Sequence, residues 1–317
     1  MTTRREWMGM TLGAGAALAF NSQLLKALSR QGARALITRA IPSSGERLPA
    51  IGLGSSATFS QVARSEDVTT LKAVLSKMVE LGGTVFDTAP SYGASEQVAG
   101  TLVQEAGLAD KIFWATKVNV ARGGAADPVA ARAQIETSFK RIGKPVIDLI
   151  QVHNMGDPAT QLGLLREYKQ AKKIRYLGIT TTSENEYPNL LKVMNSEQLD
   201  FIGIDYAVDN REVEQTILPA AKERGVAVLV YAPFGRTRLW RRVGDRPVPD
   251  YAKEFGAATW AQFFLKFAIS HPVVTAATPA TSQPANMADN IGAMMGTLPD
   301  EAMRRRMVAT VDALPQA

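Results

Sequence analysis

Eight short apolar segments recur along the sequence, and most of them are separated by stretches with the period of an amphipathic helix. Each segment has at most seven residues and is rich in Val, Ile, Leu or Phe, which is typical of a buried strand. Strands that alternate with helices predict a parallel sheet. The predicted strands are residues 49–54, 84–89, 112–118, 148–153, 174–180, 201–206, 227–233 and 273–279.

The segments between these strands carry helix boundary signals. Residues 65–82 begin with a candidate Ser cap and end on Gly82, and residues 126–143 end on Gly143. Eight strands with helices between them predict a (β/α)8 TIM barrel, an α/β fold that takes about 250 residues in one domain. The alternative is a doubly wound sheet, but no GxGxxG follows the first strand, so the dinucleotide fingerprint of that fold is missing.

Four polar residues stand at or just beyond the ends of predicted strands. Asp87 and Tyr92 lie in FDTAPSYG, Lys117 lies in FWATKVN, and His153 lies in LIQVHN. A parallel barrel gathers its chemistry at the carboxyl ends of its strands, so we expect these side chains to meet in one active site.

These four residue types can handle protons together. The ordinary pKa of Tyr92 is about 10, and an adjacent Lys117 ammonium favours the phenolate and lowers that pKa. Asp87 supplies the counter-charge that keeps a buried lysine protonated. His153 can orient a carbonyl oxygen or take part in proton transfer. The alternative is a purely structural ion pair of Asp87 and Lys117, with the other two residues incidental.

Composition removes competing chemistry. The chain has no cysteine and only two histidines, which excludes disulfides, thiolate sites and a multi-histidine centre, so we predict no metal. The second histidine, His271, precedes a proline near a strand start and is interpreted as structural. The formal net charge is +6, but residues 1–39 hold six basic residues against one acidic residue. The remaining chain carries about +1, so we expect no nucleic-acid partner.

The four residues, in this order and spacing, resemble the Asp, Tyr, Lys and His tetrad of the aldo-keto reductases. The similarity runs from ALITRAIPSSGERLPAIGLGS, which resembles the family's N-terminal β-hairpin and first barrel strand, to TPATSQPANMADNIGA. It implies an enzyme, an NAD(P)(H)-dependent oxidoreductase that transfers hydride between nicotinamide and an aldehyde or ketone. Tyr92 would be the general acid or base, and the partner would be a small-molecule carbonyl substrate.

The resemblance also implies where the cofactor lies. Phosphates are expected at the loops after the last strands and at helix N-termini. Tyr231 takes the place of an aromatic that stacks on nicotinamide, with ordinary barrel packing as the alternative. Residues 236–242, RTRLWRR, are either a solvated loop or a site for cofactor phosphate or an acidic substrate. The expected cofactor-binding residues are Thr180, Thr181, Tyr231, Pro233, Phe234, Gly235, Arg236, Thr281, Ser282, Asn286, Asp289 and Asn290.

Some positions depart from the family pattern. Members that prefer NADPH usually grip its 2'-phosphate with basic residues, whereas this chain has Ala280 and Asn286 at those sites. Each missing charge-assisted hydrogen bond is worth about 1.5–3 kcal/mol. The expected cofactor is NADPH, and NADH stays open for this reason. At the nicotinamide carboxamide, Thr180 and Thr181 replace Ser-Asn, and Gly203 replaces a Gln.

The altered nicotinamide contacts motivate a second class of function, a nucleotide-binding sensor or interaction protein that binds cofactor without turnover. Phe59, Met155 and Trp240 lie in or near loops expected to rim the substrate pocket, and the alternative for each is ordinary packing. We expect a monomer.

The first twenty residues read as a separate signal. Arg4 and Arg5 precede a short apolar stretch from Met8 to Phe20, which resembles a twin-arginine export signal. We expect residues 1–35 to be signal and flexible segment and residues 36–317 to be the barrel. The precursor would then have the twin-arginine translocation machinery as a partner, and the product would be periplasmic, without stable membrane insertion. The alternative is a frayed amphipathic helix in a cytoplasmic protein.

Overall fold

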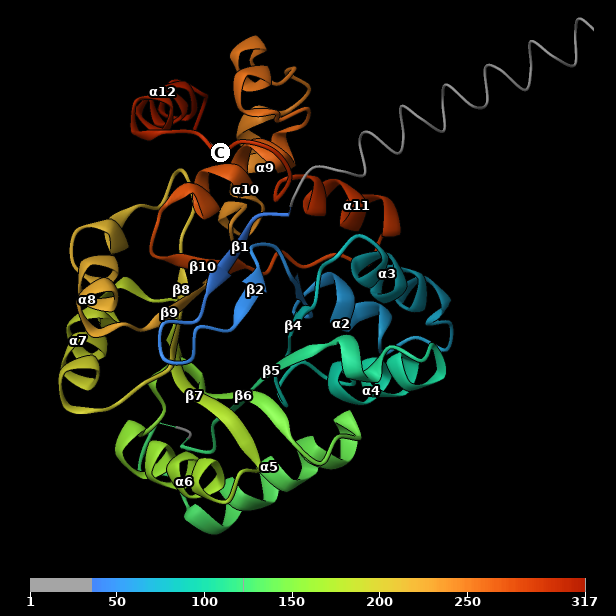
Figure 1. Ribbon diagram of the computed structural model, residues 1–317, viewed down its shortest axis with the longest axis vertical. Coiled ribbons are helices and arrows are strands. Elements are labelled where there is room, and N and C mark those ends of the chain that lie inside the picture. The colour runs from blue at the N-terminus through green and yellow to red at the C-terminus, as the bar shows by residue number, and fades with distance from the viewer. Residues whose placement is uncertain (1–35, 122, 317) are drawn as a thin grey trace, which may run out of the picture. The chain divides into compact units, whose positions relative to one another are not determined.

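The computed structural model describes residues 36–121 and 123–316, and Ile37–Ala317 forms one compact unit. The predicted export signal lies outside the described residues. All eight predicted barrel strands are present (Figure 1). They are β3 (Leu53–Gly54), β4 (Val85–Asp87), β5 (Phe113–Val118), β6 (Ile147–Val152), β7 (Ile174–Thr181), β8 (Phe201–Asp205), β9 (Ala227–Tyr231) and β10 (Val274–Ala277).

The eight strands form one parallel sheet in sequence order, from β3 to β10. The sheet closes on itself, because Ile51 and Gly54 form parallel bridges to Ala277 and Ala280. Parallel neighbours that close into a ring confirm the predicted (β/α)8 barrel and exclude the doubly wound sheet.

The closing strand β3 is shorter than predicted, and glycines on it and just before it lie close to neighbouring backbone. A Cβ atom at Gly54 would lie 2.5 Å from the Thr278 carbonyl oxygen, and one at Gly52 would lie 2.6 Å from the Val85 carbonyl oxygen. Neither position has room for a side chain. Gly54 therefore lets the first strand approach the segment after the last strand closely enough to close the barrel, and Gly52 lets it approach β4.

Complete burial explains why the other segments form strands. Every residue of β5, β6 and β8 is buried, as expected for parallel strands covered on both faces. The predicted N-terminal hairpin is also present, as the antiparallel pair β1 (Thr38–Ala40) and β2 (Arg47–Pro49). Its Ile41 and Leu48 join the core cluster that contains Val85, Phe113 and Phe201. The hairpin lies across the barrel in Figure 1 and covers the end where the strands begin.

Helices surround the barrel and follow most of the strands. The α-helices are α2 (Thr58–Val62), α3 (Thr69–Glu80), α4 (Ser95–Glu105), α5 (Pro128–Ile142), α6 (Pro158–Gln170), α7 (Tyr187–Ser196), α8 (Ile217–Arg224), α9 (Arg238–Val243), α10 (Trp260–Ser270), α11 (Pro284–Gly292) and α12 (Glu301–Asp312). The 3-10 helices are η1 (Ala109–Lys111), η2 (His153–Met155), η3 (Glu184–Glu186), η4 (Glu212–Glu214), η5 (Gly235–Thr237) and η6 (Asp250–Phe255). Within the described residues, none of these helices is long and apolar enough to span a bilayer.

One predicted helix boundary is wrong and another is confirmed. The expected cap Ser65 instead donates its hydroxyl to the Val62 and Asp67 carbonyls, in the turn after α2. Helix α3 therefore begins later, where the Asp67 carboxylate accepts the Thr69 N–H at 2.9 Å. Helix α5 ends as predicted on Gly143, which has a left-handed φ of 74°.

Candidate active site

Asp87 and Lys117 form a buried ion pair at the carboxyl ends of adjacent strands. Asp87 is the last residue of β4, and Lys117 is the fifth residue of β5. Lys117 Nζ lies 2.6 Å from Asp87 Oδ1 and donates a second bond of 2.8 Å to the Thr88 carbonyl. The two side chains are only 1% and 4% exposed. Each charge is therefore held in place by the other, because either alone would be strongly destabilising there.

Tyr92 and His153 complete the group of four. Tyr92 follows β4 in a turn, where its N–H donates to the Ala89 carbonyl, and His153 directly follows β6. Lys117 Nζ lies 5.2 Å from the centre of the Tyr92 ring. The Tyr92 and His153 rings meet edge to face, with centroids 5.8 Å apart. The structure thus brings the four predicted side chains together.

Burial dominates the electrostatics of this group. It raises the pKa of Tyr92 above its ordinary value, and the opposing attraction of Lys117 is smaller. Lys117 thus lowers the Tyr92 pKa as expected, but burial outweighs this effect. Burial, and then Lys117, lower the pKa of His153 to about 3, so its imidazole is neutral at physiological pH. Burial also raises the pKa of Asp87, with Lys117 acting against it.

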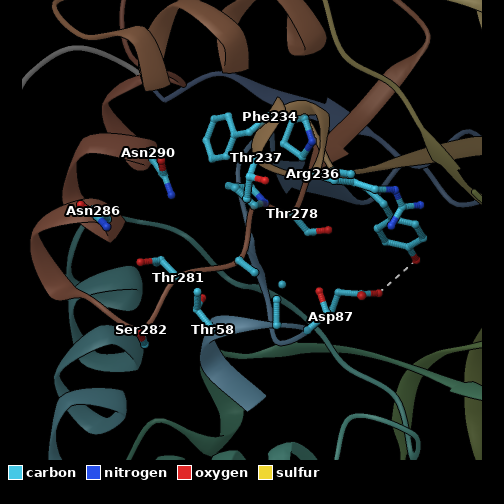
Figure 2. A pocket seen from close by; sticks show the side chains of 18 of the residues that line it. Thr58, Asp87, Phe234, Arg236, Thr237, Thr278, Thr281, Ser282, Asn286 and Asn290 are labelled. Carbon is cyan, nitrogen blue, oxygen red and sulfur yellow. Dashed lines mark hydrogen bonds between the residues drawn. The ribbon is translucent and has the colours of Figure 1, made fainter. Parts of the chain in front are cut away.

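These residues line the inner end of a cavity of about 1080 Å³ at the carboxyl ends of the strands. Figure 2 shows Asp87 and Arg236 on one side of it, with Thr281, Ser282, Asn286 and Asn290 on the other. The second group belongs to the loop after β10 and to helix α11. We call the part around Lys117 the inner end and the part around α11 the outer end.

Most of the predicted cofactor residues line this cavity. Those that do are Thr180, Tyr231, Pro233, Phe234, Arg236, Thr281, Ser282, Asn286, Asp289 and Asn290. Thr181 and Gly235 are not among the lining residues. The Thr181 hydroxyl is turned toward its own loop, where it accepts the Ser183 N–H at 3.2 Å. Gly235 is buried, and a Cβ atom added to it would lie 3.1 Å from the Asp209 carboxylate.

One of the three predicted substrate-pocket residues, Trp240, lines the cavity. Phe59 is fully buried and packs edge to face on Phe86, so it belongs to the core. Met155 does not line the cavity either. Trp240 does, but it packs on Phe234 and on Phe264 of α10, with centroids 5.0 and 5.6 Å apart. Trp240 is therefore part of the wall formed by the loop after β9.

The basic segment 236–242 is mostly engaged within the protein. Arg238 binds Asp209 at 2.7 Å, and Arg242 is buried and donates to the Val311, Leu314 and Pro315 carbonyls. Only Arg236 of this segment's arginines lines the cavity, where it lies 3.4 Å from Asp205. Burial raises the pKa of Asp205 to about 6, and Arg236 acts against that rise. The segment therefore combines exposed residues such as Arg236 and Arg241 with the buried Arg242, and its cavity-lining cation is Arg236.

The loop that carries Arg236 has a strained backbone. Ala232, Arg236 and Thr237 have φ angles of 48°, 55° and 94°, in the left-handed region that disfavours residues with a side chain. All three line the cavity. Strain of this kind is concentrated in proteins at ligand clamps and active sites.

The outer end is almost without positive charge. Among the described residues that line the cavity, the cations are Lys117 and Arg236, and neither belongs to α11 or the loop before it. Asp289 is already bonded to Thr259 and Gln262, at 2.8 Å from each. Asn286, where the family pattern has a basic residue, is exposed.

Two parts of the site were missed from the sequence. Gln151 is fully buried on β6, opposite Lys117 in the parallel register, and donates to the Tyr231 hydroxyl at 2.9 Å. Its signal was a polar residue between Ile150 and Val152 in a mostly apolar strand. Thr259 and Trp260, at the start of α10, also line the cavity, although no motif marks them. Among the described residues, no group of three or more His, Asp or Glu side chains is placed to hold a metal.

The chain is similar in sequence to known aldo-keto reductases. In sequence, the chain is 30% identical over 210 residues to aldo-keto reductase YhdN of Bacillus subtilis, covering 63% of this chain and 62% of that protein. It is 26% identical over 227 residues to aldo-keto reductase yakc [NADP(+)] of Schizosaccharomyces pombe, covering 66% of each. The matches thus span somewhat less than two-thirds of these relatives.

Solved structures share the fold. An aldo-keto reductase from Klebsiella pneumoniae in complex with NADPH superposes with a TM-score of 0.71 at 21% identity, covering 89% of this chain and 98% of that one. The holo form of aldo-keto reductase AKR11C1 from Bacillus halodurans gives 0.70 at 23% identity, covering 87% and 96%. The model of the aldo/keto reductase family matches residues 50–307. This match covers most of the barrel, and the chain belongs to the aldo/keto reductase family.

Proposed function

We propose that the protein is an NAD(P)(H)-dependent oxidoreductase that transfers hydride between nicotinamide C4 and the carbonyl carbon of an aldehyde or ketone. One observation carries the proposal: Tyr92, Lys117 and His153 meet at the inner end of a cavity that continues to α11. A proton donor next to a buried charge, at the end of a nucleotide-sized cavity, suits carbonyl reduction. The relative named for NADP(+) and the structure in complex with NADPH support a nicotinamide cofactor.

The cavity residues fit such a cofactor. The volume of about 1080 Å³ is sufficient for a nucleotide and a small substrate. Ser282, Asn286 and Asn290 line the outer end with hydroxyl and amide groups that would bind the adenosine end, and Arg236 would supply a cation to a phosphate. When bound, the reduced nicotinamide supplies the hydride.

The protein's own residues handle the proton. Because burial raises its pKa, Tyr92 is protonated at neutral pH and can give its proton to the carbonyl oxygen as negative charge develops there. Lys117 then stabilises the tyrosinate that remains. His153 is neutral, so its N–H can orient the carbonyl oxygen without supplying the proton. Asp87 keeps Lys117 charged and in place.

The neutral outer end bears on the choice between NADPH and NADH. No lysine or arginine of the described cavity lining lies on α11 or in the loop before it. A 2'-phosphate there would lack the charge-assisted bonds that distinguish the two cofactors. We therefore propose that the protein accepts both, without the strong preference for NADPH expected of a basic site.

Turnover separates this proposal from a sensor role. Purified protein is mixed with NADPH or NADH and a panel of aldehydes, and oxidation of the cofactor is followed by absorbance. Steady turnover that is lost in Tyr92→Phe supports the oxidoreductase. A nucleotide that binds but is never oxidised, with every aldehyde, would instead indicate a non-turnover nucleotide-binding protein.

Export belongs to the same proposal. Arg4, Arg5 and the apolar stretch after them support twin-arginine translocation to the periplasm. Fractionation of cells that express the full chain tests it, with Arg4→Lys/Arg5→Lys as the matched variant. The protein should be recovered from the periplasm, and the variant should stay in the cytoplasm. Equal distribution of the two would contradict export by this route.

A further inference from the structure

The Tyr231 hydroxyl reaches into the barrel and binds the ion pair. Tyr231 is the last residue of β9, and its ring lines the cavity. The hydroxyl donates to Asp87 Oδ2 at 3.1 Å and accepts from Gln151 Nε2 at 2.9 Å. The other oxygen of Asp87 accepts from Lys117. One carboxylate is therefore shared between Lys117 and Tyr231.

Gly203 makes this arrangement possible. A Cβ atom at Gly203 would overlap the Tyr231 ring, closer than real Cβ atoms come to any neighbour. The ring thus occupies the space where a side chain from β8 would otherwise project. Gly203, which departs from the family pattern, therefore leaves the space that the inward-pointing Tyr231 ring occupies.

The same ring also faces the lysine. Lys117 Nζ lies 5.0 Å from the centre of the Tyr231 ring and 5.2 Å from the centre of the Tyr92 ring. Both distances are within the range of cation–π attraction. Tyr231 therefore contacts the ion pair twice, by its hydroxyl at Asp87 and by its ring at Lys117.

We infer that Tyr231 is a positioning residue of the active site: its hydroxyl group keeps Asp87 ionised and directed at Lys117, and so sets the charge next to Tyr92. The inference rests on the proposed function, because it concerns the same proton donor. The inference adds a fifth residue that acts on the tetrad through its hydrogen bond to Asp87. This role is separate from any stacking of the Tyr231 ring on a cofactor.

The charges around Asp87 agree with this role. Burial holds the pKa of Tyr231 well above its ordinary value, so the hydroxyl remains a donor across the physiological range. Burial raises the pKa of Asp87, and the bonds from Lys117 and Tyr231 oppose the rise. The other titratable or charged groups that face the ion pair of Asp87 and Lys117 are Tyr92, Tyr231, the neutral His153 and Arg236.

Tyr231→Phe tests the inference, because it keeps the ring and removes only the hydroxyl. Without that donor the pKa of Asp87 rises further, and Lys117 loses its counter-charge at a higher pH. The acidic limb of the plot of kcat against pH should move to higher pH by about one unit. Loss of a hydrogen bond to a charged carboxylate raises its pKa by about that amount. Cofactor affinity should change less than about threefold, because the ring that faces the cavity is retained.

Tyr206→Phe is the matched control. Tyr206 is also fully buried, and its hydroxyl donates to the carboxylate of Glu214, but it does not line the cavity. This variant should lose stability without moving the acidic limb. A shift of equal size in both variants would mean that Tyr231 contributes only to stability, and would overturn the inference.

A measurement that needs no turnover separates failure of the inference from failure of the proposed function. The carboxyl carbon of Asp87, followed by 13C NMR in the full chain, reports its protonation directly. Its titration should move to higher pH in Tyr231→Phe and also in Gly203→Ala, which displaces the ring but keeps the hydroxyl. Unchanged Asp87 titration in both variants would overturn the inference, whether or not the protein turns over an aldehyde.

Discussion

The two ends of the cavity differ in the charge of the side chains that line them. At the inner end, Lys117 and Asp87 are only 1% and 4% exposed and are fixed by adjacent strands. At the outer end, α11 and the loop before it offer hydroxyl and amide groups, and Asn286 is exposed. Desolvation therefore dominates the charged groups of the inner end, whereas the outer end offers neutral hydroxyl and amide groups, of which Thr281 and Asn290 are buried. We therefore expect that a change of cofactor choice at the outer end leaves proton transfer at the inner end undisturbed.

Lys117→Met is the change with the largest expected effect at the inner end. It leaves the Asp87 carboxylate buried without its counter-charge, and breaking a buried pair in this way costs about 3–5 kcal/mol. The free energy of unfolding, from urea denaturation at pH 7, should fall by that amount, and aldehyde reduction should be lost. The double variant Asp87→Asn/Lys117→Met should recover much of the stability but none of the activity. If Lys117→Met is as stable as the parent, the Asp87 carboxylate is hydrated. The contrast between a buried inner end and the outer end would then be wrong.

Tyr92→Phe should affect activity with little effect on stability. The ring and its edge contact with His153 are retained, and only the proton donor is removed. Loss of a general acid lowers kcat by about 100- to 10,000-fold. Steady-state kinetics and a cofactor titration by fluorescence measure both quantities on the same sample. If the affinity for cofactor falls as steeply as kcat, Tyr92 contributes to binding at the outer end as well, and the two ends are not independent.

The same contrast explains what the sequence could predict. The barrel strands were predictable because each is a short apolar run, and the tetrad was predictable because its members stand at or near the ends of such runs. Gln151 shows what the motifs omit, since its role depends on Tyr231, eighty positions away. Phe59 shows a different limit: the sequence placed its loop near the cavity but not the direction of its ring, which packs on Phe86.

The outer end was predicted less completely because several segments converge there. Resemblance identified Thr281, Asn286 and Asn290, but Thr259 and Trp260 come from α10, a helix that no motif connects with a ligand. Only folding brings α10 beside α11. Local pattern therefore specifies the strand-borne inner end better than the loop-borne outer end.

Asn286→Arg tests the independence of the outer end. An arginine at this exposed position can form charge-assisted hydrogen bonds with a 2'-phosphate, each worth about 1.5–3 kcal/mol. The dissociation constant for NADPH should fall by about 10- to 150-fold, and that for NADH should change little. Asn286→Gln is the matched control and should leave both unchanged. If kcat with NADH also changes in Asn286→Arg, the outer end is coupled to proton transfer.

The smallest predicted effect is a pH dependence of stability from His153 at the inner end. Burial, and then Lys117, lower its pKa to about 3, whereas in the unfolded chain it takes up a proton near pH 6.5. Between these values the unfolded state binds one more proton, so the free energy of unfolding falls by about 1.4 kcal/mol per unit as the pH decreases. Relative to His153→Gln, which lacks this group, the parent should lose about 1.6 kcal/mol between pH 6.5 and pH 5 in urea denaturation, because the unfolded imidazole is only half protonated at pH 6.5. If the difference in free energy of unfolding between the two proteins stays constant over this range, the pKa of His153 is the same in the folded and unfolded states. The imidazole would then be hydrated, and burial would not control the inner end.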